Sequence, residues 1–198
     1  QLFIFYLLYS LLLSPWWVHN WNKYDNFVRL NLSMGYHLYS GNNPLNKSGG
    51  GIGGVDVNHG WTTDDMRERP LEFDKKFKKD AFDFIKANPK KFIKLSIIKF
   101  KRFWQIYPYA EEYRGIFYKI SSIFSYGLVL IFSILFLTSS LKKFLIKISP
   151  LITIILLTTA IHCLTIASIR YRFPIEPILI VFASYYLYNQ FKKFKLLK

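Results

Sequence analysis

Three long apolar runs in the C-terminal part of the chain constrain its fold more than any other feature. Residues 120–141 contain no charged side chain, residues 148–169 only the ionisable His162, and residues 173–191 only Glu176. A helix rises 1.5 Å per residue, so about 20 apolar residues cross the hydrocarbon core of a membrane. Three buried helices of this length would exceed the core of so small a soluble domain. These three runs are therefore predicted to be transmembrane helices.

The chain opens inside a fourth apolar run, without an initiator methionine. This run, Leu2 to Leu13, is too short to cross a bilayer. A cleaved signal peptide is the rival explanation, but cleavage follows small residues and would not fall inside an apolar run. We interpret residues 1–14 as a truncated transmembrane helix and the chain as a fragment of a longer protein. The expected fold is mainly α and integral to the membrane, with this truncated span, three full transmembrane helices and one outer helical and loop segment.

Lysines flank the apolar runs unevenly, and they predict how the chain is oriented. Cytoplasmic loops of membrane proteins carry an excess of Lys and Arg. The link at 142–147 contains three lysines and the tail at 192–198 contains four, so both are expected in the cytoplasm. Residues 15–119 and the short turn at 170–172 are then expected on the outer side of the membrane, away from the cytoplasm. The net charge of +15 raises nucleic-acid binding as a function, but the lysines are spread between these flanks and the helices below, so no nucleic-acid partner is expected.

The outer segment, residues 15–119, divides into two parts of different composition. Up to about residue 70 it is rich in Asn, Gly, Asp and Trp, which is typical of loops. The glycine-rich stretch at 48–54 matches no phosphate-binding pattern, so it is interpreted as a flexible loop. From residue 71 the apolar spacing becomes helical, and basic amphipathic helices are predicted at about 71–87 and 90–104. The first helix fits either a membrane interface or packing on its own domain, whereas the aromatic and arginine residues that end the second favour the interface.

Four motifs resemble a known family in their order and in their placement outside the membrane. They are Pro15-Trp16-Trp17-Val18-His19-Asn20, the stretch 35–44 ending Gly41-Asn42-Asn43-Pro44, the helix at 85–104, and Arg170-Tyr171-Arg172-Phe173-Pro174-Ile175-Glu176-Pro177. Together they resemble the C-terminal half of bacterial integral-membrane glycosyltransferases of the GT-C type. These are glycosyltransferase family 39-like proteins, similar to the protein O-mannosyltransferases and the lipid A aminoarabinose transferases. His19 departs from the pattern, which has Arg at that position.

The resemblance implies an enzyme that moves a sugar from a polyprenyl-phosphate donor to a glycan, lipid or protein acceptor of the cell envelope. The catalytic acidic residue of the family lies in the first outer loop, which this chain does not contain. We therefore expect no catalytic residue here and no sugar transfer by residues 1–198 alone. The different-class alternative is a non-enzymatic membrane subunit of polysaccharide assembly or export. The sugar, the acceptor and the oligomeric state cannot be read from the sequence.

Arg170 and Arg172 are the predicted binding residues for the donor phosphate. Arginines in a short outer loop run against the positive-inside bias, and a guanidinium group suits two-pronged phosphate binding. The alternative is that they reach out to lipid headgroups. Glu176 is either an ion-pair partner of one of them or a functional acid at membrane depth. The motifs also supply candidate substrate-binding residues: Tyr171, Glu176, His19, Asn20, Asn42 and Asn43.

Other polar clusters are expected to be structural. Asp64 and Asp65 are adjacent carboxylates in a loop with no supporting pattern, so a solvated acidic turn is favoured over a catalytic or metal pair. A divalent metal is not indicated by this segment, because the spacing of the outer histidines and acids matches no standard ligand pattern. These residues are His19, His37, Asp56 and His59. The lone Cys163 excludes an internal disulfide and any cysteine-based zinc site.

Overall fold

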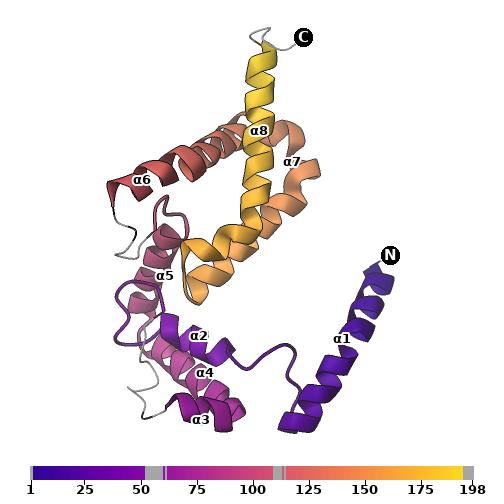
Figure 1. The fold of residues 1–198 in the computed structure, drawn as a ribbon, viewed down its shortest axis with the longest axis vertical. Coiled ribbons are helices and arrows are strands. Elements are labelled where there is room, and N and C mark those ends of the chain that lie inside the picture. Colours follow the sequence, from indigo (N-terminus) through magenta and orange to yellow (C-terminus); the bar gives the residue numbers. More distant parts are fainter. Residues whose placement is uncertain (1, 52–59, 61, 109–112, 114, 194–198) are drawn as a thin grey trace.

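The computed structural model describes residues 2–51, 60, 62–108, 113 and 115–193, and within them the chain is all-helical with no strands (Figure 1). The mainly α expectation is therefore confirmed. A π-helical turn, Ile123–Gly127, joins α6 to α7, and a 3-10 helix, Ile169–Ile175, joins α7 to α8. The α-helices are α1 (Leu2–Tyr24), α2 (Met34–Gly41), α3 (Thr63–Glu68), α4 (Pro70–Ala87), α5 (Pro89–Phe103), α6 (Ile116–Ser122), α7 (Leu128–Leu164) and α8 (Glu176–Lys193).

Two helical stretches, Ile116–Ser139 and Phe144–Leu164, are long and apolar enough to span a membrane. Large apolar side chains along both stretches are exposed, including Ile131, Leu156 and Leu157, as lipid-facing residues would be. Three full spans were expected, and two of them correspond to helices of sufficient length and apolar character. The third window starts as a 3-10 helix and continues as α8, which has Glu176 at one end and two lysines at the other. That α8 crosses the membrane stays a prediction.

The expected link between the first two spans is helical, which corrects the sequence interpretation. The α-helix runs without interruption through the lysines at 142–147, and α7 changes direction there (Figure 1). Leu137 and Ile155 line one cavity, although 18 residues of straight helix would separate them by about 27 Å. The bend therefore folds the two spans back against each other without a loop.

A Ser-Pro pair lies inside each of the two longest helices. In each pair the serine hydroxyl replaces the backbone hydrogen bond that the proline cannot make. Proline has no N–H to donate to the carbonyl four residues before it. The hydroxyl of Ser149 donates instead to the carbonyl of Ile146, at 3.0 Å, next to Pro150. Ser14 does the same for Leu11, at 2.8 Å. This second pair explains why α1 continues to Tyr24 and does not end at residue 14 as expected.

The larger hydrophobic core lies between α7, α8 and the end of α5. Its buried residues include two phenylalanines, Phe136 and Phe182, whose ring centroids lie 4.9 Å apart. Ser133 ties α7 to α8 through a 2.6 Å hydrogen bond to the carbonyl of Leu179. Hydroxyl groups commonly link transmembrane helices in this way. Phe103 of α5 belongs to the same core, so α5 is packed onto α7 and α8.

Helix α4 packs against α2, which decides between the two readings of the 71–87 helix. Phe77 is fully buried, and its ring contacts Tyr39 of α2 at 5.2 Å between centroids. The lysines on the other faces of α4 are exposed. Helix α2 is too short to be stable alone and forms because Leu38 and Tyr39 are buried against α4. Composition predicted only loops up to about residue 70, and α2 shows that this part of the chain also contains helix.

Helix α5 presents an apolar stripe away from the protein. Ile93, Ile97 and Phe100 are half exposed, whereas Leu95 and Phe103 face the core. An apolar stripe beside basic residues suits the membrane interface. That α5 lies at the membrane interface stays a prediction.

Candidate functional site

The arginine turn, Ile169–Ile175, leads from the second candidate span into α8. The hydroxyl of Ser168 accepts a hydrogen bond from the N–H of Arg170, and its carbonyl accepts from the N–H of Tyr171 at 3.1 Å. Pro174 fixes one backbone angle near the end of the turn. These local bonds give the turn a defined shape just beyond Leu164.

Arg172 is buried and holds the turn in place. Its Nε donates to the carboxylate of Glu176 at 2.9 Å, and its Nη1 donates to the carbonyls of Phe103 and Gln105. The guanidinium carbon lies 3.5 Å from the ring centroid of Tyr126. The ion-pair interpretation of Glu176 is thereby confirmed. Only 3% of Arg172 is exposed, so its predicted phosphate role competes with contacts that the protein already makes.

Arg170, in contrast, is exposed, and its side chain makes no hydrogen bond or ion pair with the described residues. Tyr171 beside it is half-buried in a stack, with its ring 4.6 Å from that of His162. His162 stacks in turn on Phe103. Of the predicted site residues of this turn, Arg170 alone is directed to the surroundings.

The asparagine loop, Asn42–Gly51, lies between α5 and the residues that follow α7. The amide nitrogen of Asn42 donates to the carbonyls of Leu38 and Leu164, each at 2.8 Å. Its amide oxygen accepts from the ammonium of Lys99 at 2.7 Å. Lys99 is fully buried, and burial lowers the pKa of its ammonium to about 8. Asn42 thus joins α2, α5 and α7 at one point.

Two further asparagines of this loop, Asn43 and Asn46, also hydrogen-bond to backbone groups through their side-chain amides. Asn43 donates to the carbonyl of Tyr39 and accepts from the N–H of Leu45, and Asn46 donates to the carbonyls of Ser40 and Gly50. The predicted substrate role of Asn42 and Asn43 stays a prediction, while their geometry shows a structural role.

Residues 48–51 are ordered, which corrects the flexible-loop expectation for this part of the glycine stretch. The carbonyl of Gly49 accepts from the N–H of Ala167 at 3.1 Å, and Arg102 donates to the carbonyl of Ala167 at 2.9 Å. Gly49 has a φ of +74°, which glycine adopts without strain. A side chain at Gly50 would meet the guanidinium of Arg102. Residues 52–54 lie outside the described part of the chain.

The Pro-Trp-Trp motif connects α1 to the segment that follows it, through hydrogen bonds to backbone carbonyls at 28–30. Trp16 donates to the carbonyl of Leu30 at 2.9 Å, and Trp17 to that of Arg29 at 3.0 Å. Asn20 is buried and donates to the carbonyl of Val28. His19 is exposed and stacks on Trp16. Asn20 therefore has a structural contact, and His19 is the accessible member of this motif.

Asp64 and Asp65 lie in the first turn of α3, where Asp65 caps the helix. Asp65 forms a capping box with Thr62 at α3 and an ion pair with Arg69, and the hydrogen bond from Thr62 lowers the pKa of its carboxyl. Asp64 lies 3.6 Å from Arg67 in an exposed pair. Among the described residues no group of three or more His, Cys, Asp or Glu could hold a metal ion. Asp56 and His59 lie outside those residues.

Two features were missed by sequence reasoning. Lys99 could have been found, because it follows Leu95 and precedes Phe103 at the four-residue spacing of one helix face. A cleft of about 480 Å³ between the asparagine loop and α5 had no sequence signal, since it joins distant segments. The cleft is lined by Asn46, Lys47, Lys90, Lys91, Lys94, Leu95 and Ile98.

No protein-family model, curated protein or solved structure matches this chain. Its function must therefore be inferred from the chemistry of the arginine turn and its surroundings.

Proposed function

We propose that this chain is part of a membrane glycosyltransferase that takes its sugar from a polyprenyl-phosphate donor, and that Arg170 binds the donor phosphate. The observation that carries the proposal is the exposed guanidinium of Arg170 on a turn fixed by the buried Arg172. A guanidinium donates two parallel hydrogen bonds to phosphate oxygens. A turn that is ordered before binding loses little entropy when the ligand arrives.

The membrane features support a donor carried on a lipid. The arginine turn begins within five residues of Leu164, where the second candidate span ends. The phosphate of a polyprenyl phosphate lies at the headgroup level, next to the end of such a span. The exposed stripe of α5 would lie at the same interface.

Arg172 and Glu176 act in this proposal as positioning residues, because they contact the turn and not the ligand. The acceptor is a glycan, lipid or protein of the envelope, on the periplasmic side of a bacterial inner membrane. The carboxylate that takes the proton from the acceptor group is not assigned to any residue of this segment.

Binding of a short-chain polyprenyl phosphate to the purified chain in neutral detergent tests the proposal. A charge-assisted hydrogen bond contributes about 1.5 to 3 kcal/mol. Arg170→Ala should therefore weaken binding by about 10- to 150-fold, at 1.4 kcal/mol per factor of ten. Arg170→Lys keeps the charge and loses the fork, so it should recover only part of the affinity.

The matched control is Lys75→Ala, which removes one exposed positive charge from α4. This variant should bind as the unchanged chain does. Wild-type binding by Arg170→Ala would show that Arg170 only reaches toward headgroups. No binding by the unchanged chain would favour the alternative function, a non-enzymatic subunit of polysaccharide assembly or export.

A further inference from the structure

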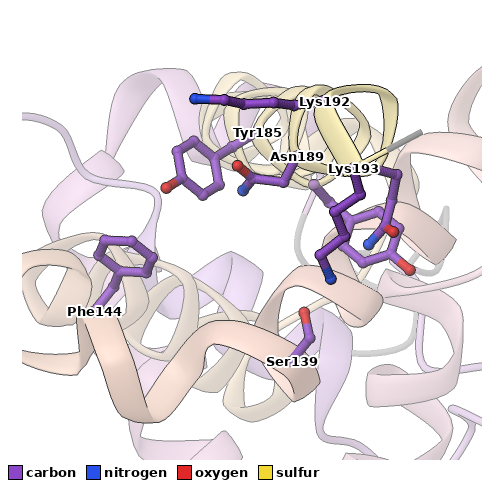
Figure 2. Close-up of a pocket in the computed structure, with 8 residues that line it drawn as sticks. Ser139, Phe144, Tyr185, Asn189, Lys192 and Lys193 are labelled. Carbon is purple, nitrogen blue, oxygen red and sulfur yellow. The ribbon is translucent and has the colours of Figure 1, made fainter. Parts of the chain in front are cut away.

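A cavity of about 500 Å³ lies between the bend of α7 and the C-terminal end of α8 (Figure 2). Ser139 ends the first candidate span and Phe144 begins the second, so the cavity lies where both spans reach one surface of the membrane. The arginine turn follows the far end of the second span, so the two sites are separate. The cavity is lined by Ser139, Phe144, Tyr185, Tyr186, Asn189, Gln190, Lys192 and Lys193.

The described charged residues of the cavity lining are both positive. They are Lys192 and Lys193, at the end of α8. From residue 116 onward the sole acidic residue is Glu176, which begins α8 at its opposite end and pairs with Arg172. No carboxylate from α7 or α8 therefore neutralises the lysines at the cavity.

The walls of the cavity combine hydrogen-bond donors with an aromatic surface. Figure 2 shows Lys193 extending from α8 toward Ser139, and Asn189 beside it with its amide group at the cavity. The ring of Tyr185 meets Phe144 edge to face, with centroids 5.6 Å apart. Ammonium and amide donors suit phosphate oxygens, and aromatic rings at the interface suit the glycerol and acyl part of a lipid.

We propose that this cavity binds the headgroup of an anionic phospholipid, such as phosphatidylglycerol. Basic pockets between membrane helices on the cytoplasmic side bind such headgroups. The lysines at this end are the ones that the positive-inside bias assigns to the cytoplasm. A soluble phosphate would share the ammonium contacts but would gain nothing from the aromatic wall. The site does not depend on the donor phosphate or on Arg170.

Native mass spectrometry of the full chain in neutral detergent, with equal amounts of phosphatidylglycerol and phosphatidylcholine, tests this proposal. The chain should retain phosphatidylglycerol in preference. The double variant Lys192→Gln and Lys193→Gln should lower its affinity for phosphatidylglycerol by about 30-fold, which corresponds to about 1 kcal/mol for each lysine. Lys75→Gln with Lys79→Gln removes the same charge from α4 and should leave the preference unchanged.

A second variant distinguishes lipid binding in the cavity from non-specific attraction of the lipid to the lysines. Asn189→Trp places an indole in the cavity and keeps every lysine, so it should also lose phosphatidylglycerol. Equal losses in the two lysine pairs would overturn the proposal, as would full retention of the lipid by Asn189→Trp. Displacement of the lipid by millimolar inorganic phosphate would show a free-anion site instead and would overturn the lipid assignment.

Discussion

At the residue scale, two buried cations are accommodated in different ways. Arg172 has a carboxylate partner in Glu176 and two backbone carbonyls, so its charge is compensated. Lys99 contacts the amide of Asn42 and, more weakly, the carbonyl of Leu164 at 3.5 Å. A buried charge without an opposite charge is costly, which is why burial lowers the pKa of Lys99. The two residues should therefore respond differently to substitution and to pH.

Arg172→Ala should lower the free energy of unfolding by about 3 to 5 kcal/mol, because it leaves Glu176 half-buried without its partner. Arg170→Ala, two residues away and exposed, should change it by no more than about 0.5 kcal/mol. Thermal unfolding of both variants in one detergent gives the comparison. Equal shifts of the two midpoints would contradict the structural role of Arg172.

The pKa of Lys99 predicts that stability rises between about pH 8 and pH 10. In this window the unfolded chain keeps a proton on Lys99 that the folded chain has lost, since the ordinary pKa is 10.5. The gain over the full interval is about 3 kcal/mol, at about 1.4 kcal/mol per pH unit. Below pH 8 both states are protonated and this contribution is flat.

Lys99→Met removes the titrating group and keeps a side chain of similar length. Its thermal midpoint should show no rise over the same window, whereas the unchanged chain shows one. An identical rise in both would assign the pH dependence to another group. Tyr39, whose pKa burial raises, affects the comparison only at higher pH.

At the element scale, close backbone approaches hold α2 against α4 and against the end of α7. Gly35 of α2 lies against the backbone of α4, and Gly41 lies against the carbonyl of Thr165. A methyl group at either position would overlap a backbone oxygen. Packed backbones cannot move aside as a flexible side chain can, so glycine is required at both positions.

Gly41→Ala should lower the unfolding free energy by about 3 kcal/mol, at the upper end of overpacking effects. For a chain of this length that corresponds to a fall of about 6 to 12 °C in the thermal midpoint. Gly115→Ala is the control, because the nearest atom to its added methyl would be 3.7 Å away. A Gly41→Ala midpoint equal to that of Gly115→Ala would show that α2 is not packed as described.

The individual helices show how far the sequence could predict the fold and the site. The helices near 71–87 and 90–104 carried clear apolar periodicity, and they correspond to α4 and α5. Helix α2 had no such signal, because its stability comes from α4. The burial of Arg172 could not be predicted either, since its partners include carbonyls nearly 70 residues away at Phe103 and Gln105. Local pattern predicts what a segment can form, and long-range packing decides which side chains stay accessible.

At the scale of the whole molecule, the proposed sites lie at opposite ends of α8 and of the second half of α7. The arginine turn and helices α2, α4 and α5 gather at one end, and the lysine-lined cavity lies at the other (Figure 1, Figure 2). This polarity follows from the charge distribution, because lysines flank the bend of α7 and the end of α8. Both the glycosyltransferase proposal and the lipid proposal require it.

Labelling of single cysteines in a Cys163→Ala background, expressed in bacterial cells, tests that polarity most directly. Lys75→Cys reports on which side of the membrane the exposed face of α4 lies. Lys193→Cys reports the same for the cavity at the end of α8. A membrane-impermeant maleimide should label Lys75→Cys in cells whose inner membrane is intact, and Lys193→Cys only after that membrane is permeabilised. Labelling of both positions under the same condition, or of Lys75→Cys only after permeabilisation, would contradict the account.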